Sequence, residues 1–154
     1  MEMSAEVAVR QASSDDVDAL APLFDAYRQF YDCPPDLPLA RNYLADRIGT
    51  GESTVFIASN GNGDIVGFTQ LYPTFCSVEA RPIFVLYDLY VSPASRQHGV
   101  GRALLTKAEA FGRASGASRL DLSTAKTNAK AQSVYESLGW VRDEVFLQYS
   151  LPLA

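Results

Sequence analysis

The sequence predicts an α/β fold in which helices cover both faces of a twisted, mixed and mostly antiparallel sheet of about six to seven strands. Segments rich in β-branched and aromatic residues alternate with segments whose apolar residues recur at helical spacing, in the order β, α, α, β, β, β, α, β, α, β. Residues 60–64, Asn-Gly-Asn-Gly-Asp, favour a tight turn and therefore an antiparallel hairpin. The strand–helix–strand unit over 83–124 predicts a right-handed crossover, which makes its two strands parallel.

The first third of the chain predicts one short strand and two helices. The strand is expected over 7–12, and a helix follows it from Asp15 to about Tyr31, where apolar residues recur every three or four positions. The proline pair at 34–35 ends this helix. A second helix is expected over 38–48, and its weak pattern marks this region as a variable wall for a substrate.

The middle of the chain predicts a hairpin. Its strands are expected over 54–58 and 65–72, on either side of the Asn/Gly turn. Pro73 is expected to end the second strand, because proline has no N–H to donate to a ladder. Residues 74–82 are then expected to form a loop.

The last half of the chain predicts five elements in a regular alternation. They are a buried strand over 83–91, a helix from Val100 to about Gly116, a strand over 120–124, a helix over 128–138 capped by Asn128, and a final strand over 145–149.

Length and composition predict one domain spanning residues 1–154. The net charge of −5 argues against a nucleic acid partner, because binding phosphates needs a basic face. Cys33 and Cys76 are too few for a disulfide framework, and no Cys/His cluster predicts a metal site. The N-terminus has no basic region followed by an apolar run, and no apolar stretch approaches the about 20 residues of a membrane span. We therefore expect a cytoplasmic protein that does not enter a membrane.

Residues 83–102 carry the strongest local signal. A buried strand is broken at Ser-Pro, the motif Arg96-x-x-Gly99-x-Gly101 follows, and a helical pattern begins directly after it. Glycines let the backbone approach a ligand, and the free N–H groups and dipole of a helix start attract an anion, most often phosphate. A glycine-rich turn without a ligand is the alternative. A Walker A loop is excluded because no Gly-Lys-Ser/Thr is present, and the Rossmann fingerprint fails because Leu104 occupies the third glycine position.

Two longer motifs make the signal more specific. Asp-Leu-Tyr-Val-Ser-Pro at 88–93 precedes the glycine loop, and Asn-x-x-Ala-x-x-x-Tyr-Glu-x-Leu-Gly-Trp at 128–140 follows after one helix and one strand. Over roughly 54–149 the chain resembles the GNAT superfamily of N-acetyltransferases, which transfer acetyl groups from acetyl-CoA to amines. The resemblance implies a GNAT-like fold and acetyl-CoA as the cofactor.

The resemblance also implies roles for individual residues. The backbone N–H groups of the glycine loop are expected to hold the pyrophosphate of CoA, and the strand end before it to pair with the pantetheine arm. Asn128 and Tyr135 match residues that contact the cofactor, and Tyr135 also matches the general acid that protonates the leaving thiolate. The expected loop and strand residues are Leu89, Tyr90, Val91, Arg96, Gln97, His98, Gly99, Val100, Gly101 and Arg102.

The chemistry of these side chains has structural alternatives. A phenol is a suitable proton donor to a thiolate, but Tyr135 also has the helical spacing of a core aromatic residue. His98 is the only histidine, and its place in the phosphate loop argues against a role as the catalytic base.

Candidate residues for the acceptor come from the strands and the first helix. Asp88 lies within an apolar strand, where a carboxylate is costly unless paired. It is a candidate for the base, for a ligand of the amine, or for a structural partner of a nearby hydroxyl. Glu79 is a second candidate for binding the amine, or a solvated loop charge. The aromatic candidates, which are either a pocket wall or ordinary core, are Tyr27, Phe30, Tyr31, Tyr72 and Phe75.

The sequence therefore predicts an N-acetyltransferase that acts on a small primary amine, such as a diamine, a polyamine or an amino acid, by direct attack. The alternatives are acetylation of a lysine or an N-terminal amine of a protein, and a CoA-binding module without catalysis. A homodimer is also expected, because the last strand at 145–149 would lie at an edge and edge strands invite pairing with a second copy.

Overall fold

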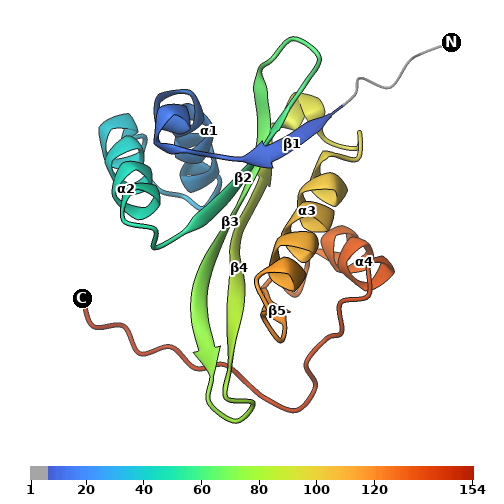
Figure 1. The fold of residues 1–154 in the computed structure, drawn as a ribbon. Helices are drawn as coiled ribbons and strands as arrows, with labels where there is room; N and C mark the ends of the chain where they lie inside the picture. Colours follow the sequence, from blue (N-terminus) through green and yellow to red (C-terminus); the bar gives the residue numbers. More distant parts are fainter. Residues whose placement is uncertain (1–6) are drawn as a thin grey trace, which may run out of the picture. The chain divides into compact units, whose positions relative to one another are not determined.

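The computed structural model describes residues 7–154, which form two compact units (Figure 1). The first unit runs to Leu122 and holds the sheet with three of the α-helices. The second unit, Ser123–Ala154, holds α4 (Ala129–Ser137). The two units are described separately.

The sheet of the described residues has five strands in the order β1-β2-β3-β4-β5. Neighbouring strands are antiparallel, except that β4 and β5 pair in parallel. This arrangement confirms the mixed and mostly antiparallel sheet, although it has fewer strands than expected. The strands are β1 (Ala8–Gln11), β2 (Thr54–Ser59), β3 (Ile65–Cys76), β4 (Arg81–Val91) and β5 (Leu120–Asp121).

Helices cover both faces of this sheet, as predicted (Figure 1). The first two helices share one core with Ile57 and Phe68. The neighbouring residue Phe56 points to the other face, where its ring lies 5.5 Å from the ring of Phe111 on the third helix. This follows from the alternation of side chains along a strand. The helices of the first unit are α1 (Val17–Phe30), α2 (Leu37–Gly49) and α3 (Val100–Ala114).

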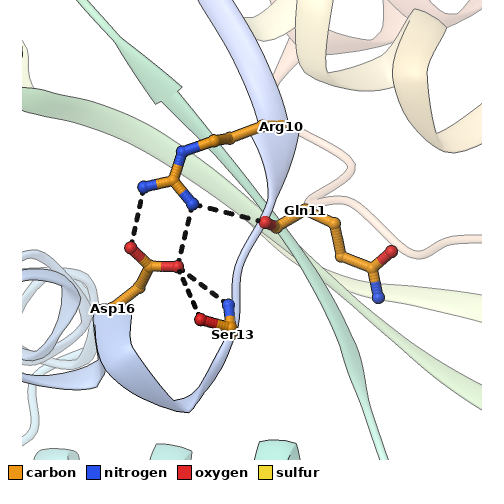
Figure 2. Close-up of polar contacts among 4 residues, drawn as sticks. All are labelled: Arg10, Gln11, Ser13 and Asp16. Carbon is orange, nitrogen blue, oxygen red and sulfur yellow. Dashed lines mark hydrogen bonds and ion pairs between the residues drawn. The ribbon is translucent and has the colours of Figure 1, made fainter.

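A polar network holds the connection between β1 and α1 (Figure 2). Arg10 binds the Asp16 carboxylate through both terminal nitrogens, at 2.7 and 2.9 Å, and the backbone N–H of Ser13 donates to the same carboxylate at 2.8 Å. The hydrogen bond from Arg10 is the main reason that the pKa of Asp16 falls to about 2. The network fixes the direction in which α1 leaves the sheet.

Gly67 allows α3 to begin close to the sheet. A Cβ atom on Gly67 would lie 2.9 Å from Val100 Cγ1, which is closer than real Cβ atoms come, and 3.2 Å from the carbonyl oxygen of Tyr90, which is tighter than most real contacts. Gly67 pairs with Val91 across β3 and β4, so the first turn of α3 sits directly over the end of β4. Gly67 therefore sets the position of the glycine loop.

A bulge in β4 changes which way its side chains point. Gln70 pairs with Asp88 but the next residue of β3 pairs with Leu86, so Tyr87 is an extra residue on β4. As a result, Phe84 and Val91 both face α3, although they would face opposite sides of a regular strand. The Phe84 ring lies 5.0 Å from the ring of Phe111 on α3. A Cβ atom on Gly101, also on α3, would lie 3.9 Å from Val91 Cγ2.

Pro73 does not end β3, contrary to expectation. β2 pairs with β3 only as far as Leu71, so the edge of β3 at Pro73 no longer faces β2. Pro73 pairs with Phe84, whose N–H points away from it and donates to the Arg119 carbonyl at 3.3 Å. The nitrogen of Pro73 therefore faces the empty edge, where a missing N–H costs no ladder hydrogen bond.

Two further boundaries differ from the expected ones. Only residues 77–80 form a turn within the expected loop 74–82, and the rest of that loop extends β3 and β4. The strand expected over 120–124 is reduced to Leu120–Asp121.

The second unit begins with a capped helix. The side chain of Asn128 accepts a hydrogen bond from the Ala131 N–H at 3.1 Å, which confirms its predicted role as the N-cap of α4. Gly139, with φ 93°, follows the helix in the left-handed conformation that terminates helices.

The strand predicted over 145–149 is absent, so that prediction was wrong for the described structure. Asp143 gives the physical reason. Its Oδ1 accepts the N–H groups of Val145 and Phe146 at 2.8 and 3.1 Å, and such local side-chain bonds compete with a strand ladder. No strand of residues 123–154 is available to pair with the segment either.

Candidate active site

The glycine loop joins the end of β4 to the start of α3. Its backbone turns back at Gln97 and Gly99, whose φ angles are 67° and 78°, and α3 begins at Val100. The Ala103 N–H is bonded to the Gly99 carbonyl at 3.0 Å, so the amides of residues 100–102 precede the regular helical ladder. These N–H groups at the positive end of the helix dipole suit a phosphate.

Arg96 holds the loop to the strand. Its Nε donates to the Val91 carbonyl at 2.9 Å, and its guanidinium lies over the rings of Tyr90 and Phe30, at 5.4 and 5.9 Å from their centroids. The predicted loop residues Gln97, His98 and Arg102 are exposed.

The strand before the loop has an open edge. β5 pairs with β4 only at Phe84 and Val85, so no strand of the first unit flanks residues 86–91 on that side. This edge includes Leu89, Tyr90 and Val91, and it leads directly to the glycine loop. Within residues 7–122, the strand edge predicted to bind the pantetheine arm therefore leads without a break into the loop predicted to bind the pyrophosphate.

Asp88 is buried on this strand, with 6% of its surface exposed. Its Oδ2 accepts from Gln70 Nε2 at 2.8 Å, and the hydroxyl of Tyr27 also hydrogen-bonds to the carboxylate. Burial raises the pKa of Asp88, while the bonds from Gln70 and Tyr27 oppose that rise. Asp88 is thus a carboxylate whose surroundings make it more ready to hold a proton than usual.

Gln70 is a site residue that the sequence did not reveal. It is fully buried, and its Nε2 is used by Asp88. Its Oε1 has no hydrogen-bond partner among the described residues. A buried amide oxygen without a donor costs about 1–3 kcal/mol, so this oxygen marks a place where a hydrogen-bond donor is missing among the described residues. A glutamine inside the apolar strand Phe68–Leu71 was the available signal.

Tyrosines gather around Asp88. The ring of Tyr27 lies 5.2 Å from that of Tyr31, and the ring of Tyr72 lies 5.5 Å from that of Tyr87. Burial, followed by the charge of Asp88, raises the pKa of Tyr27, and Asp88 also contributes to a raised pKa of Tyr72. We call this set the tyrosine surface, and its members are Tyr27, Tyr31, Tyr43, Tyr72 and Tyr87.

The tyrosine surface combines predicted and unforeseen residues. The structure brings together Tyr27, Tyr31 and Tyr72, as the acceptor prediction requires. Tyr43 joins them through a 2.6 Å hydrogen bond between its hydroxyl and that of Tyr72. Tyr87 joins because the bulge turns it to the same face as Asp88, so that both influence Tyr27.

Glu79 lies apart from this group. It sits in the turn between β3 and β4, where it forms an exposed ion pair with Arg119 at 3.1 Å. The neighbouring side chains of Ser118 and Arg119 lower its pKa. Since roughly 23 Å of extended strand separates Arg81 from Asp88, we place Glu79 outside the acceptor site.

Tyr135 and Asn128 belong to the second unit. Tyr135 lies in the last turn of α4 and is half-buried, with its ring 6.2 Å from that of Trp140. Asn128 caps the same helix. Their contacts with the cofactor remain predictions.

Neither a metal site nor a membrane span is found in the described part. Residues 7–154 contain no group of three or more His, Cys, Asp or Glu side chains that could hold a metal ion. No helix among them is both long enough and apolar enough to cross a membrane.

Comparison with known proteins identifies the family. The sequence model of the Acetyltransferase (GNAT) family matches residues 19–140. The uncharacterized N-acetyltransferase YhfO of Bacillus subtilis (strain 168) is 44% identical over 143 residues, which cover 93% of this chain and 95% of YhfO. The aminoglycoside N(6')-acetyltransferase type 1 of Stenotrophomonas maltophilia is 27% identical and covers 77% of this chain and 80% of its own.

A solved structure agrees with this match. The crystal structure of a probable acetyltransferase has a TM-score of 0.90 and 36% identity to this chain, covering 96% of this chain and 98% of its own. The chain belongs to the GNAT family of acetyltransferases.

Proposed function

We propose that the protein transfers the acetyl group of acetyl-CoA to the primary amine of a small molecule by direct attack. The observation that carries this proposal is the buried carboxylate of Asp88 on an open strand edge that runs into the glycine loop. A proton acceptor, a place for an extended arm and a place for a diphosphate follow one another along residues 88–102.

The residues of the first unit fit acetyl-CoA. The edge at Leu89–Val91 offers backbone groups to an extended arm, and the amides at the start of α3 offer donors to its diphosphate. When bound, acetyl-CoA supplies an activated acetyl group whose carbonyl carbon the amine attacks.

Asp88 would act as the base. An amine attacks only when its nitrogen is neutral, so a proton must leave it. Asp88 takes that proton, directly or through a water molecule, and its raised pKa makes it a better base than an exposed aspartate.

Tyr135 would act as the acid. As the bond between the acetyl carbon and sulfur breaks, the sulfur leaves as a thiolate, which the phenol of Tyr135 protonates. The products are an amide and free CoA, and the phenolate of Tyr135 regains its proton from solvent.

The similarity to an aminoglycoside acetyltransferase supports a small-molecule amine as the acceptor. Release of CoA thiol from acetyl-CoA, measured over a panel of amines and peptides, tests the proposal. The proposal is supported if small amines are acetylated by the wild type, if Asp88→Asn loses this turnover, and if Tyr135→Phe reduces it. Turnover with peptides alone would indicate a protein acetyltransferase, and tight CoA binding without any turnover would indicate a binding module.

We further propose that residues 1–154 act as a single domain within a cytoplasmic homodimer. The free cysteines Cys33 and Cys76 support a reducing compartment. The segment 145–149 supports pairing between copies, because its apolar side chains are exposed and no strand of the second unit pairs with it.

A further inference from the structure

We infer that the acceptor is a monoamine: one primary ammonium group carried on an apolar aliphatic or aromatic body. Its nitrogen would bind at Asp88 and Gln70, and its body would lie against the tyrosine surface. This inference rests on the proposed acetyl transfer and narrows its substrate to molecules with a single positive charge.

The first argument is that Asp88 and Gln70 leave one place for a donor. Asp88 is buried, and the described groups that hydrogen-bond to its carboxylate, Gln70 and Tyr27, are both neutral. The Oε1 of Gln70 is buried and has no partner in the part of the chain that the structure describes, so an incoming nitrogen reaches it only when the side chains that cover it move aside. A primary ammonium carries three N–H groups, so one nitrogen can donate to the carboxylate and to the amide oxygen together. The amide cannot turn its Nε2 outward without losing its bond to Asp88.

The second argument is that the walls around Asp88 are aromatic. Tyr31 and Tyr87 are 63% and 68% exposed, although both rings pack against other tyrosines. Exposed rings grouped in this way mark a binding surface. They contact apolar groups through their faces and attract an ammonium through cation–π interactions.

The third argument is that positive charges flank the tyrosine surface. The guanidinium of Arg47 lies 5.4 Å from the ring centroid of Tyr43. That of Arg96 lies 5.4 Å from the ring centroid of Tyr90, whose ring is in turn 5.7 Å from the ring of Tyr27. Arg47 is paired with Glu52 at 3.6 Å, which offsets part of its charge. A second ammonium on the same acceptor would approach one of these cations, which disfavours polyamines and aminoglycosides.

The fourth argument is that two acidic side chains on and after α1, Asp25 and Asp36, already accept hydrogen bonds from within the protein. Asp25 accepts from the backbone N–H of Asp36 at 3.0 Å and from Gln29 at 3.2 Å. Asp36 caps α2 by accepting from the Leu39 N–H at 3.1 Å. The carboxylate that contacts the tyrosine surface through Tyr27 is that of Asp88, whereas a site for a polycation would present several carboxylates.

The test compares matched amines in one assay. The value of kcat/KM is measured for 2-phenylethylamine and hexylamine, which are monoamines, and for 1,4-diaminobutane, spermidine and kanamycin, which carry more charges. We expect the monoamines to exceed the polycations at least about tenfold, which corresponds to about 1.4 kcal/mol. Equal or higher values for spermidine or kanamycin would overturn the inference.

Variants of the exposed tyrosines locate the effect. Tyr31→Ala and Tyr87→Ala should each raise KM for 2-phenylethylamine about threefold to tenfold, with little change for 1,4-diaminobutane. Val78→Ala, at a side chain that is 97% exposed in the turn between β3 and β4, is the matched control and should change neither value. A uniform loss for all amines would contradict a role in specificity.

Direct binding separates the two proposals. If no amine is acetylated, the proposed function fails. Calorimetric titration of the amines into the protein then tests the monoamine site independently of turnover. Binding of 2-phenylethylamine that is tighter than that of 1,4-diaminobutane, and is lost in Gln70→Leu and Asp88→Asn, supports the monoamine site. Absence of such binding in folded protein overturns it.

Discussion

At the scale of single residues, Asp88 determines how the rate should depend on pH. Burial raises its pKa above the ordinary aspartate value, and a base works only when ionised. We therefore expect kcat/KM to rise with pH through this raised pKa, and Asp88→Asn to lower kcat about 100- to 10,000-fold and remove that limb. Thiol release between pH 4.5 and 9 measures it. Glu109→Gln, on the surface of α3, should keep the wild-type profile.

The same burial predicts an effect on stability with the opposite sign. Because the folded state favours protonated Asp88, the free energy of unfolding should fall as pH rises from the ordinary aspartate pKa through the raised one. Asp88→Asn should remove this fall and be at least as stable as the wild type at pH 7. Urea unfolding at several pH values checks it. A strongly destabilised variant would mean that loss of activity reports unfolding rather than loss of the base.

Asp16 predicts the reverse dependence. Arg10 and Ser13 hold its pKa at about 2. Its contribution to stability is therefore fully present above the ordinary aspartate pKa and is lost as pH falls from there to about 2. Asp16→Asn should lower the free energy of unfolding by about 1 kcal/mol at pH 7 and by progressively less in acid. Asp15→Asn is the matched control, and an equal loss in both variants would contradict the role of the network.

At the scale of elements, the packing of α3 on β3 should control cofactor affinity. Gly67→Ala forces a Cβ atom against Val100 and the Tyr90 carbonyl, so the start of α3 must move away from the end of β4. We expect a loss of about 1–3 kcal/mol of stability and a CoA affinity reduced about tenfold or more. Gly61→Ala is the control, because nothing lies within 4 Å of a Cβ there. Calorimetry with CoA that finds equal affinities would disprove the link.

Most elements could be predicted from local pattern, whereas the errors arise from hydrogen bonding that the pattern does not specify. Pro73 fits inside β3 because β2 has already ended, and the segment 145–149 forms no strand because Asp143 takes two of its N–H groups. The first fact depends on where a distant strand ends, and the second on a local side-chain bond that periodicity does not report. A strand pattern shows that a segment has the propensity to pair, but whether a partner strand lies beside it depends on the rest of the fold.

The site shows the same division. The glycine loop is continuous in sequence and was predicted residue by residue, whereas Gln70 and Tyr87 required knowledge of the register between β3 and β4. A one-residue shift turns a side chain to the other face of a sheet, so the bulge at Tyr87 could not be derived from periodicity. Tyr43 came from the helix with the weakest pattern.

At the scale of the whole molecule, the segment 145–149 should determine the oligomeric state. Its apolar side chains are exposed, so we expect light scattering to give a dimer and Leu147→Asp to give a monomer with an unchanged far-UV spectrum. Val78→Asp, at an exposed turn, is the control and should stay dimeric. A wild-type monomer at every concentration would reject the proposed homodimer.

The extra residue in β4 has a consequence for engineering. Deleting Tyr87 would leave the chain able to form its hairpin. However, each side chain from Arg81 to Leu86 would then move to the other face of the sheet, while Asp88 kept its own. Ile83, now buried, would leave its present neighbours and turn toward α3, and Phe84 would lose its contact with Phe111. Point substitutions in this arm can therefore be explored at exposed positions, but insertions and deletions cannot, because the length of the arm determines which residues face α3.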